Sequence, residues 1–353
     1  MLPDRSGPRA HDHGHTQRLD TDLEGADWSA NELPAGQRLE LEEEPARGHS
    51  YWSLSVHRLF RKKLAVVCLS VILVMYVGAL LSPLITPYEY TAQDLSQSRA
   101  GPTLAHPFGA DRLGRDMMTR VIYGLRTTVI ITIISLLGGT LILGIVLGLL
   151  SGYMGRWVDS VIMRTGEVTS SFPDIILILI FVAALKPRLV GLVQGFEDAT
   201  GIDWILRLGI LDYAIISFAL SIFGWFGMAR LVRGQVLQAR ESQYTEAALV
   251  AGASTARILR AHVLPNILSP LIVSISAGLA GVAGSELVLS WIGIGVQPPV
   301  PSLGRMMFEN GSIQVLRNEP HLILFPIGAV TLLFFCFNIL GDAVNDAFNP
   351  RAR

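Results

Sequence analysis

Six apolar segments, each long enough to cross a bilayer as a helix, constrain this sequence more than any other feature. A membrane-spanning helix needs about 20 predominantly apolar residues. The third segment has a polar start near residue 164 and ends before Lys186; the other five are residues 64–85, 127–150, 213–232, 265–291 and 321–340. Only 16% of the residues are charged, well below the quarter or so that is usual in soluble domains. The pattern predicts an all-α, polytopic membrane protein.

The charges flanking the first span predict its orientation. Residues 51–63 combine aromatic and basic side chains, which is typical of a helix lying on a membrane surface. The basic cluster before residue 64 places the N-terminus in the cytoplasm, and six spans then return the C-terminus to the same side. A net charge of −1 gives no indication of nucleic-acid binding.

Residues 1–50 differ from the rest of the chain. They are acidic and contain few large apolar residues, so we expect a disordered tail rather than a secretory signal. His11, His13 and His15 alternate as in some metal-binding tracts, although solvated histidines are the better interpretation. Cys68 and Cys336 both lie in apolar spans, where small packing residues are a simpler interpretation than a disulfide or a metal pair.

Glycines in the second span predict a close helix contact. Gly144, Gly148 and Gly152 recur at a spacing that places them on one helix face. Small residues at this spacing allow a neighbouring helix to approach closely.

The connector between the fourth and fifth spans has the pattern of a helix, a tight turn and a second helix. Ser242 is placed to cap the first helix, and Glu246 falls in its first turns, where a carboxylate is favoured. Gly252 can adopt the left-handed conformation that ends a helix. Ser254 can cap the second helix, and Pro265 suits the first turn of the next span.

This connector resembles the EAA loop of ABC importer permeases, which in that family lies in the cytoplasm and docks into a cleft of an ATPase subunit. The resemblance rests on Glu-Ala-Ala, three further residues, Gly, and Leu-Pro at the entry to the next span. It implies an ATPase-coupling role for Glu246, Ala247, Ala248, Gly252, Arg257, His262, Leu264 and Pro265.

Two further stretches are similar to the peptide and nickel branch of these permeases. One is residues 106–116, in which Asp111 and Asp116 alternate with arginines and, with Arg112, Arg115 and Arg120, can form an ion-pair and turn network. The other is residues 291–304, rich in Gly and Pro. The arginines of the first stretch conflict with the positive-inside bias, because the loop is expected outside.

Three carboxylates near or within the spans are candidates for the substrate pathway: Glu286, Glu167 and Asp174. Ionisable groups at membrane depth are costly and face a partner or a wet path. Glu286 can line the route or join two helices, and Glu167 can line it or pair with Arg164.

The resemblance covers roughly residue 52 onward and is closest to the C-type permease of dipeptide and oligopeptide importers. It implies the type I ABC importer permease fold in a bacterial plasma membrane, with both termini cytoplasmic. The implied partners are a homologous second permease, two ABC ATPase subunits, an extracytoplasmic substrate-binding protein and membrane lipid. The expected organisation is a tail (1–50), an interfacial helix with the first span and an external loop (51–126), a five-span core (127–343) containing the coupling loop (241–264), and a C-terminal tail (344–353).

The chain has no phosphate-binding loop, so we expect no ATPase activity of its own; ATP and magnesium belong to the partner subunits. No cofactor, metal or catalytic residue is predicted in this chain. A nickel or other small-solute importer remains the alternative within the family. A secondary transporter should show inverted repeats. An intramembrane hydrolase needs a nucleophile and a base within reach, whereas the histidines near the spans lie at span ends.

Overall fold

The structure is a computed structural model that describes residues 51–201 and 203–348. Contacts within the chain separate residues 1–53 from a second unit, Leu54–Arg353, which contains all the spans. The predictions for the tail and for its alternating histidines lie outside the described residues. The first described helix is α2 (Tyr51–Arg61), where the sequence predicts an interfacial helix.

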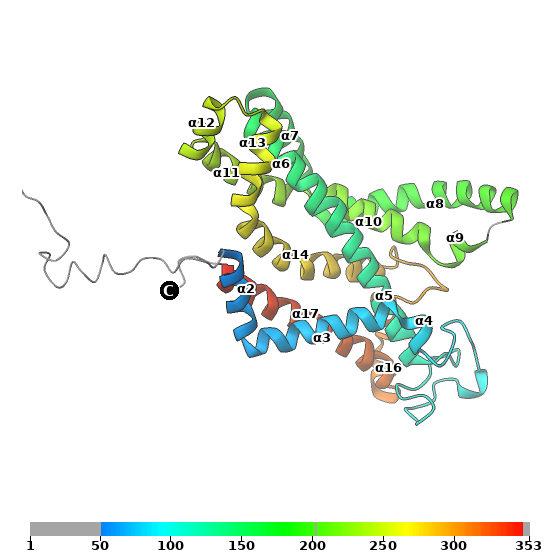
Figure 1. Ribbon diagram of the computed structural model, residues 1–353. Coiled ribbons are helices and arrows are strands. Elements are labelled where there is room, and N and C mark those ends of the chain that lie inside the picture. Colours follow the sequence, from blue (N-terminus) through cyan, green and yellow to red (C-terminus); the bar gives the residue numbers. More distant parts are fainter. Residues whose placement is uncertain (1–50, 202, 349–353) are drawn as a thin grey trace, which may run out of the picture. The chain divides into compact units, whose positions relative to one another are not determined.

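Within the described residues, six helices or helix series are long and apolar enough to cross a membrane. They are α3 (Lys63–Leu80); α5 (Met117–Ser135) continued by η2 (Leu136–Gly144) and α6 (Ile145–Met154); α8 (Asp174–Thr200); α10 (Ile210–Gly224) with α11 (Phe226–Arg240); α14 (Leu264–Ile292); and α17 (His321–Phe348). The only β feature in the described part is an isolated bridge between Ala110 and Asp116. The predicted all-α, six-span architecture is confirmed (Figure 1).

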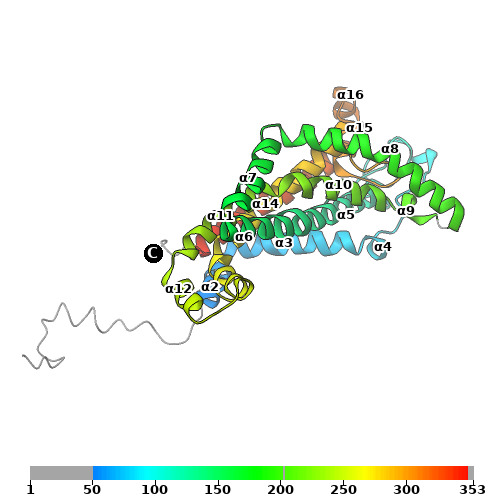
Figure 2. The ribbon, with the colours of Figure 1, turned by 90° about the horizontal axis from the view of Figure 1, so that it is seen from above.

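Short elements connect the spans. They are α4 (Ser82–Ile85), η1 (Leu95–Gln97), α7 (Arg156–Ser170), α9 (Trp204–Arg207), α12 (Gln243–Val250), α13 (Thr255–Ile258), η3 (Leu259–Val263), α15 (Leu303–Asn310) and α16 (Ile313–Asn318). Figure 2 shows α12 and α2 at one end of the bundle and α9 and α16 toward the other.

Two of the bundle's apolar clusters share the helices α5 and α14. One joins α3, α5, α14, α15 and α17, and includes Cys68 and Cys336 as buried thiols. The second joins α5, α8, α10 and α14 around Ile216 and Leu289. Because α5 and α14 contribute to both clusters, they form the centre of the fold.

The second span starts earlier than the hydropathy suggests. Its helix begins at Met117, with Asp116 as the N-cap accepting a hydrogen bond from the Thr119 amide at 2.7 Å. The polar residues that hide this start, Thr119 and Arg120, are buried against protein rather than exposed to lipid.

The third span also differs from the prediction. Residues 156–170 form a separate amphipathic helix, α7, and the spanning helix α8 begins at Asp174 and continues through Lys186 and Pro187 to Thr200. The spacing of apolar residues between Lys186 and Asp212 predicts short amphipathic helices on the outer face, but up to Thr200 a single helix takes their place. The charge at Lys186 is tolerated because its ammonium lies 2.6 Å from the Asp212 carboxylate on α10.

The predicted glycine contact is confirmed. A Cβ built at Gly144, Gly148 or Gly152 would lie 2.7, 2.6 or 2.7 Å from the Cβ of Met228, Val232 or Val236, respectively. The helices α6 and α11 therefore touch through bare backbone on one side, and we call this contact the glycine seam. No side chain larger than hydrogen fits at these positions without separating the two helices.

The last span is longer than expected. Helix α17 includes residues 344–348, which the sequence assigns to a tail, because Ala343, Val344 and Ala347 are buried. Asp346 near its end lies 2.6 Å from Lys62 at the start of α3, so these two helix ends are adjacent.

Candidate functional site

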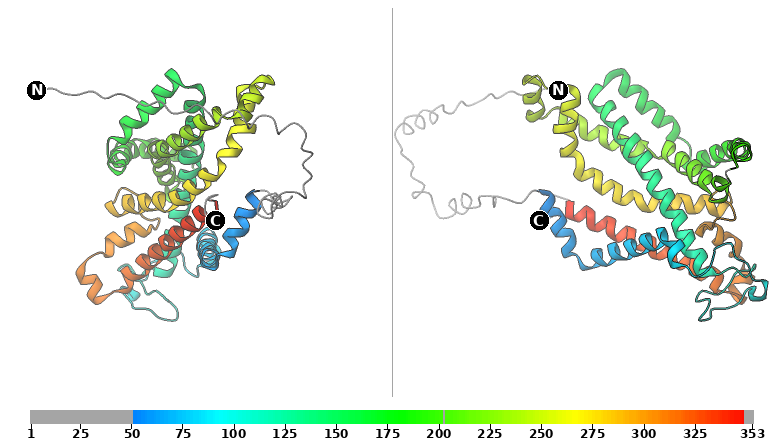
Figure 3. Two further views of the ribbon diagram at one scale, coloured as in Figure 1. Left: turned by 90° about the vertical axis from the view of Figure 1, so that its left-hand side faces the viewer. Right: turned by 45° about the vertical axis from the view of Figure 1, so that its right-hand side comes forward.

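The connector between α11 and α14 folds as the predicted helical hairpin. Residues 241–264, called the hairpin here, contain α12, a turn, α13 and η3, and lead directly into α14 with Pro265 in its first turn. Figure 3 shows the hairpin projecting at the end of the bundle where α11 and α14 meet.

The start of the hairpin is held differently from the prediction. The Ser242 hydroxyl does not cap α12; it turns back and donates to the Ala239 carbonyl at the end of α11. Thr245, which the sequence analysis missed, is fully buried and donates to the same carbonyl at 2.8 Å. The two hydroxyls thus add side-chain hydrogen bonds to a carbonyl at the end of α11 that also accepts from the Ser242 amide, and they fix the angle between α11 and α12.

The turn of the hairpin depends on Gly252. Its φ is +76°, the left-handed conformation predicted for this position. The Ala253 amide donates to the Ala248 carbonyl at 3.0 Å, the bond that ends a helix in a Schellman motif. A Cβ at Gly252 would meet no atom of this chain within 4 Å, so the requirement for glycine is conformational.

The inner face of the hairpin packs on the bundle. Ala248, Ile258 and Val263 are buried in one apolar cluster with Val236 and Ile267 of the adjoining spans. Burying apolar area of this kind stabilises by about 25 cal/mol per Å². The hairpin is therefore fixed to α11 and α14 rather than hanging from them.

The outer face of the hairpin has charged and apolar groups without partners in this chain. Glu246, Ala247 and Arg257 are exposed, and Val250 is 90% exposed. No hydrogen bond or ion pair of the Glu246 side chain forms with the rest of the described chain. Leu264 is half-buried and Pro265 exposed, while the side chain of His262 lies outside the described set.

Glu286, the predicted carboxylate of the fifth span, is fully buried. It accepts hydrogen bonds from Thr128 of α5 and from Ser290 of its own helix, each at 2.8 Å. The sequence leaves open whether it lines the route or joins helices, and here it connects α14 to α5.

The other two candidate carboxylates are exposed and lie at the junction of α7 and α8. Glu167 pairs with Arg164 at 3.1 Å on the surface of α7, and Asp174 begins α8 after Pro173. The structure does not bring them together with Glu286.

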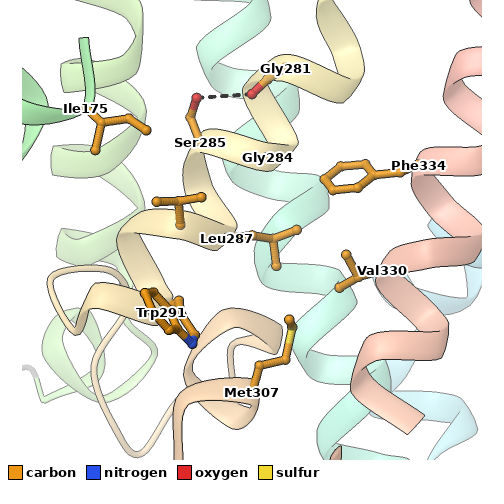
Figure 4. Close-up of a pocket in the computed structure, with 10 residues that line it drawn as sticks. Ile175, Gly281, Gly284, Ser285, Leu287, Trp291, Met307, Val330 and Phe334 are labelled. Carbon is orange, nitrogen blue, oxygen red and sulfur yellow. Dashed lines mark hydrogen bonds between the residues drawn. The ribbon is translucent and has the colours of Figure 1, made fainter. Parts of the chain in front are cut away.

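An apolar pocket of about 490 Å³ lies on the opposite face of α14 from the Glu286 contacts. Figure 4 shows Leu287, Val330 and Phe334 on one side and Ser285 bonded to the Gly281 carbonyl at 3.1 Å. The lining residues are Ile175, Gly281, Gly284, Ser285, Leu287, Val288, Trp291, Met307, Val330 and Phe334. Sequence reasoning did not find this pocket, because its walls come from four helices.

The loop of residues 106–116, called the Asp111 loop here, forms much of the predicted charge network. The buried Asp111 carboxylate accepts from Arg115 at 2.7 Å and lies 3.5 Å from Arg120. It also accepts from the backbone amides of Leu113 and Arg115. Two details differ from the prediction: Arg112 is exposed outside the network, and Asp116 contacts His106 at 2.9 Å instead of an arginine.

These features define a multi-pass helical membrane protein that presents a structured hairpin beyond its spans. Among the described residues, no group of three or more His, Cys, Asp or Glu side chains could hold a metal ion. The arrangement offers packing and docking surfaces, as a transport subunit does.

Comparison with known proteins agrees. Residues 144–353 match the family described as binding-protein-dependent transport system inner membrane component, and residues 50–102 match the N-terminal transmembrane domain of oligopeptide transport permease C. The chain therefore belongs to the family of binding-protein-dependent transport system inner membrane components, as its motifs predict.

Individual relatives cover most of the chain. The dipeptide transport system permease protein DppC of Bacillus subtilis (strain 168) is 33% identical over 86% of this chain and 87% of its own length. The oligopeptide transport system permease protein OppC of Haemophilus influenzae is 30% identical over 89% of this chain and 93% of its own. The glutathione transport system permease protein GsiD of Pectobacterium atrosepticum is 33% identical over 86% of this chain and 92% of its own length.

Proposed function

We propose that this chain is one of two permease subunits of an ATP-driven importer of dipeptides or oligopeptides. Its relatives carry the names of dipeptide, oligopeptide and glutathione permeases, and the similarity extends over nearly the whole of both chains. The observation that carries the coupling role is the hairpin, with an inner face buried on the bundle and an outer face of Glu246, Ala247 and Arg257 without partners.

In this proposal the hairpin docks into an ATPase subunit, and ATP and magnesium are held there. Closure of two such ATPases moves the hairpin, and the buried contacts of Ala248, Ile258 and Val263 transfer the movement to α11 and α14. Packed elements of this kind switch between discrete arrangements. The transport pathway then opens alternately to the two sides of the membrane. A second, homologous permease completes this pathway, and a binding protein delivers the solute to it.

The orientation follows from the same placement. The hairpin docks in the cytoplasm, and the helix ends joined by Lys62 and Asp346 lie toward that end of the bundle (Figures 1 and 3). Both termini are then cytoplasmic, and the Asp111 loop is extracytoplasmic. Arg115 of the loop and Arg120 of α5 share the Asp111 carboxylate, so one negative charge offsets part of the positive charge on this side.

For the three candidate pathway carboxylates the proposal assigns two roles. Glu286 acts as a tie between α5 and α14, supported by its complete burial and its hydrogen bonds to Thr128 and Ser290. The second role is contact with a partner chain or with the solute, which we assign to Glu167 and Asp174 because both are exposed.

The decisive experiment is affinity purification of the tagged chain from its native membrane in mild detergent, with the partners identified by mass spectrometry. We expect to recover two phosphate-loop ATPases, a second permease and a binding protein that binds peptides. Recovery of the chain alone, or as a homo-oligomer after cross-linking, would overturn the proposal. A Glu246→Lys variant should lose the ATPases and keep the second permease.

A further inference from the structure

A second apolar groove, of about 660 Å³, runs between the second and fourth spans. Its walls are almost entirely hydrocarbon. The lining residues are Ile130, Ile134, Gly138, Ile142, Leu143, Ile210, Tyr213, Ala214, Ser217, Phe218, Ser221 and Ile222. A groove of this composition fits an extended hydrocarbon chain better than it fits a polar solute.

Arg126 lies at the end of this groove. It precedes Ile130 by four residues on α5, so it lies on the same helix face as Ile130 and Ile134. Its Nε is buried and has no hydrogen-bond partner, and its guanidinium has no acidic partner in the described part of the chain. The carbon of its guanidinium lies over the Tyr123 ring, 5.8 Å from the ring centroid. An ionised side chain at such a position normally has a partner.

Phenol groups surround Arg126. The Tyr90 ring lies 4.6 Å from the Tyr123 ring, and Tyr213, whose hydroxyl is 3.4 Å from that of Thr127, lines the groove itself. Burial, Tyr123 and Glu89 raise the pKa of Tyr90, while Arg207 and Arg126 act in the opposite direction, so two cations and one carboxylate lie near the same phenol. Tyrosine hydroxyls and arginines together are donors suited to phosphate oxygens.

The depth of Arg126 suits a headgroup. The helix from Arg126 to Met154 rises about 40 Å at 1.5 Å per residue, which is roughly the thickness of a bilayer including its headgroups. Tyrosines are enriched at this level of a membrane. The groove below Arg126 then lies in the hydrocarbon layer.

We propose that this groove binds an anionic phospholipid, with an acyl chain along Ile130, Ile134 and Phe218 and the phosphate at Arg126. The apolar walls need an apolar occupant, and the unpaired guanidinium needs an anion. A single anionic lipid supplies the apolar chain and the anion, whereas an apolar helix of another subunit supplies the apolar surface alone. The site holds a structural lipid and is independent of which solute is transported.

The test uses the full chain with the subunits that it retains, in phosphatidylcholine nanodiscs. These contain a small fraction of phosphatidylglycerol or phosphatidylcholine with a photoreactive acyl chain, and labelled peptides are mapped by mass spectrometry. We expect phosphatidylglycerol to label the groove about fivefold more than phosphatidylcholine, the factor that one basic residue contributes at an anionic surface. Arg126→Gln should remove this preference and Arg126→Lys should keep most of it. Arg188→Gln, which removes an exposed arginine of α8, should change nothing.

A second variant separates the groove from the headgroup contact. Ile134→Trp fills the groove and should lower the labelling by both lipids equally. Equal labelling of the wild type by both lipids, or an unchanged preference in Arg126→Gln, would overturn the proposal. So would a photoreactive amino acid at position 134 that cross-links to a polypeptide rather than to lipid.

Discussion

The Asp111 loop and the hairpin lie at different ends of the bundle (Figure 3) and use their charged residues in opposite ways. In the Asp111 loop the central carboxylate is buried and bound by Arg115, by Arg120 and by two backbone amides. In the hairpin, Glu246 and Arg257 are exposed and have no ion pairs within the described chain.

The difference separates a scaffold from a docking surface. Buried charges that pair with one another fix a loop without a second protein, whereas charges left free on a rigid support can be satisfied by a partner. Both connectors are rich in charge in the sequence, and the geometry shows which charges are paired within the chain. The predictions below test whether the distinction is real.

The largest effect is expected at Asp111. Asp111→Asn removes the charge that compensates Arg115 and Arg120, and breaking a buried pair in this way costs about 3–5 kcal/mol of folding free energy. Unfolding in detergent, followed by circular dichroism against denaturant, measures it. Arg257→Gln on the hairpin is the control and should change stability by less than about 0.5 kcal/mol. Equal losses in both variants would abolish the distinction.

The glycines of the two connectors give a sharper contrast. Gly114 and Gly252 both have positive φ, +72° and +76°, so alanine costs each about 1–2 kcal/mol. A Cβ at Gly114 would also lie 1.7 Å from the Asp94 carbonyl oxygen, whereas at Gly252 it meets nothing within 4 Å. In thermal unfolding, the melting temperature of the Gly114→Ala variant should therefore lie well below that of the Gly252→Ala variant. The reverse order would contradict the geometry of the Asp111 loop.

At Glu246 we expect a loss of function without a loss of stability. Glu246→Lys reverses an exposed charge, and a like charge placed against a partner costs several kcal/mol of binding. Peptide uptake in reconstituted vesicles should fall by more than about tenfold, with an unchanged melting temperature. Asp198→Lys, an exposed carboxylate at the end of α8, should transport normally. Normal uptake by Glu246→Lys would remove the docking role.

The smallest effect is expected at Asp159 of α7, an intermediate case in which a surface carboxylate is satisfied within the chain. The hydrogen bond from Arg233, at 2.7 Å, together with that from Ser151 holds the pKa of Asp159 below its ordinary value. A lowered carboxyl pKa contributes stability that is complete above about pH 5 and is lost as the pH falls through about 4 toward the lower pKa of the folded state.

Arg233→Gln should therefore destabilise the chain by about 1 kcal/mol at neutral pH, the upper end for a partly exposed pair. It should also flatten the decline in stability between about pH 5 and pH 3. Equilibrium unfolding at a series of pH values measures both effects. An unchanged acid slope in Arg233→Gln would show that the pair does not couple α7 to α11.

The sequence was sufficient for the features that depend on local chemistry. Apolar length predicts six spans, the conformational demand at Gly252 predicts the turn of the hairpin, and the spacing of Gly144, Gly148 and Gly152 predicts a close contact. In each case the information lies within one helix or one turn.

What could not be predicted depends on a distant partner. Helix α8 continues past Lys186 because Asp212 neutralises the ammonium, and α5 starts at Met117 because its polar residues are buried against other helices. One failure is local: the Ser242 hydroxyl can cap α12 or turn back to the Ala239 carbonyl, where Thr245 also binds, and the sequence does not select between these two nearby acceptors and donors. Arg126 was not noticed, because only the fold places it beside a groove.

The glycine seam has a consequence for how force would pass through the protein. Side chains in an interface act as compliant spacers, since their rotamers absorb small displacements, but on α6 the contact surface is backbone. In the proposed mechanism a shift of α11 would then reach α6 almost undiminished, so the hairpin would move two helices rather than one. The contact is stiff because glycine places no side chain between the two backbones. Even one methyl group at Gly148 should therefore separate α6 from α11, weaken their packing and reduce the movement that one helix passes to the other.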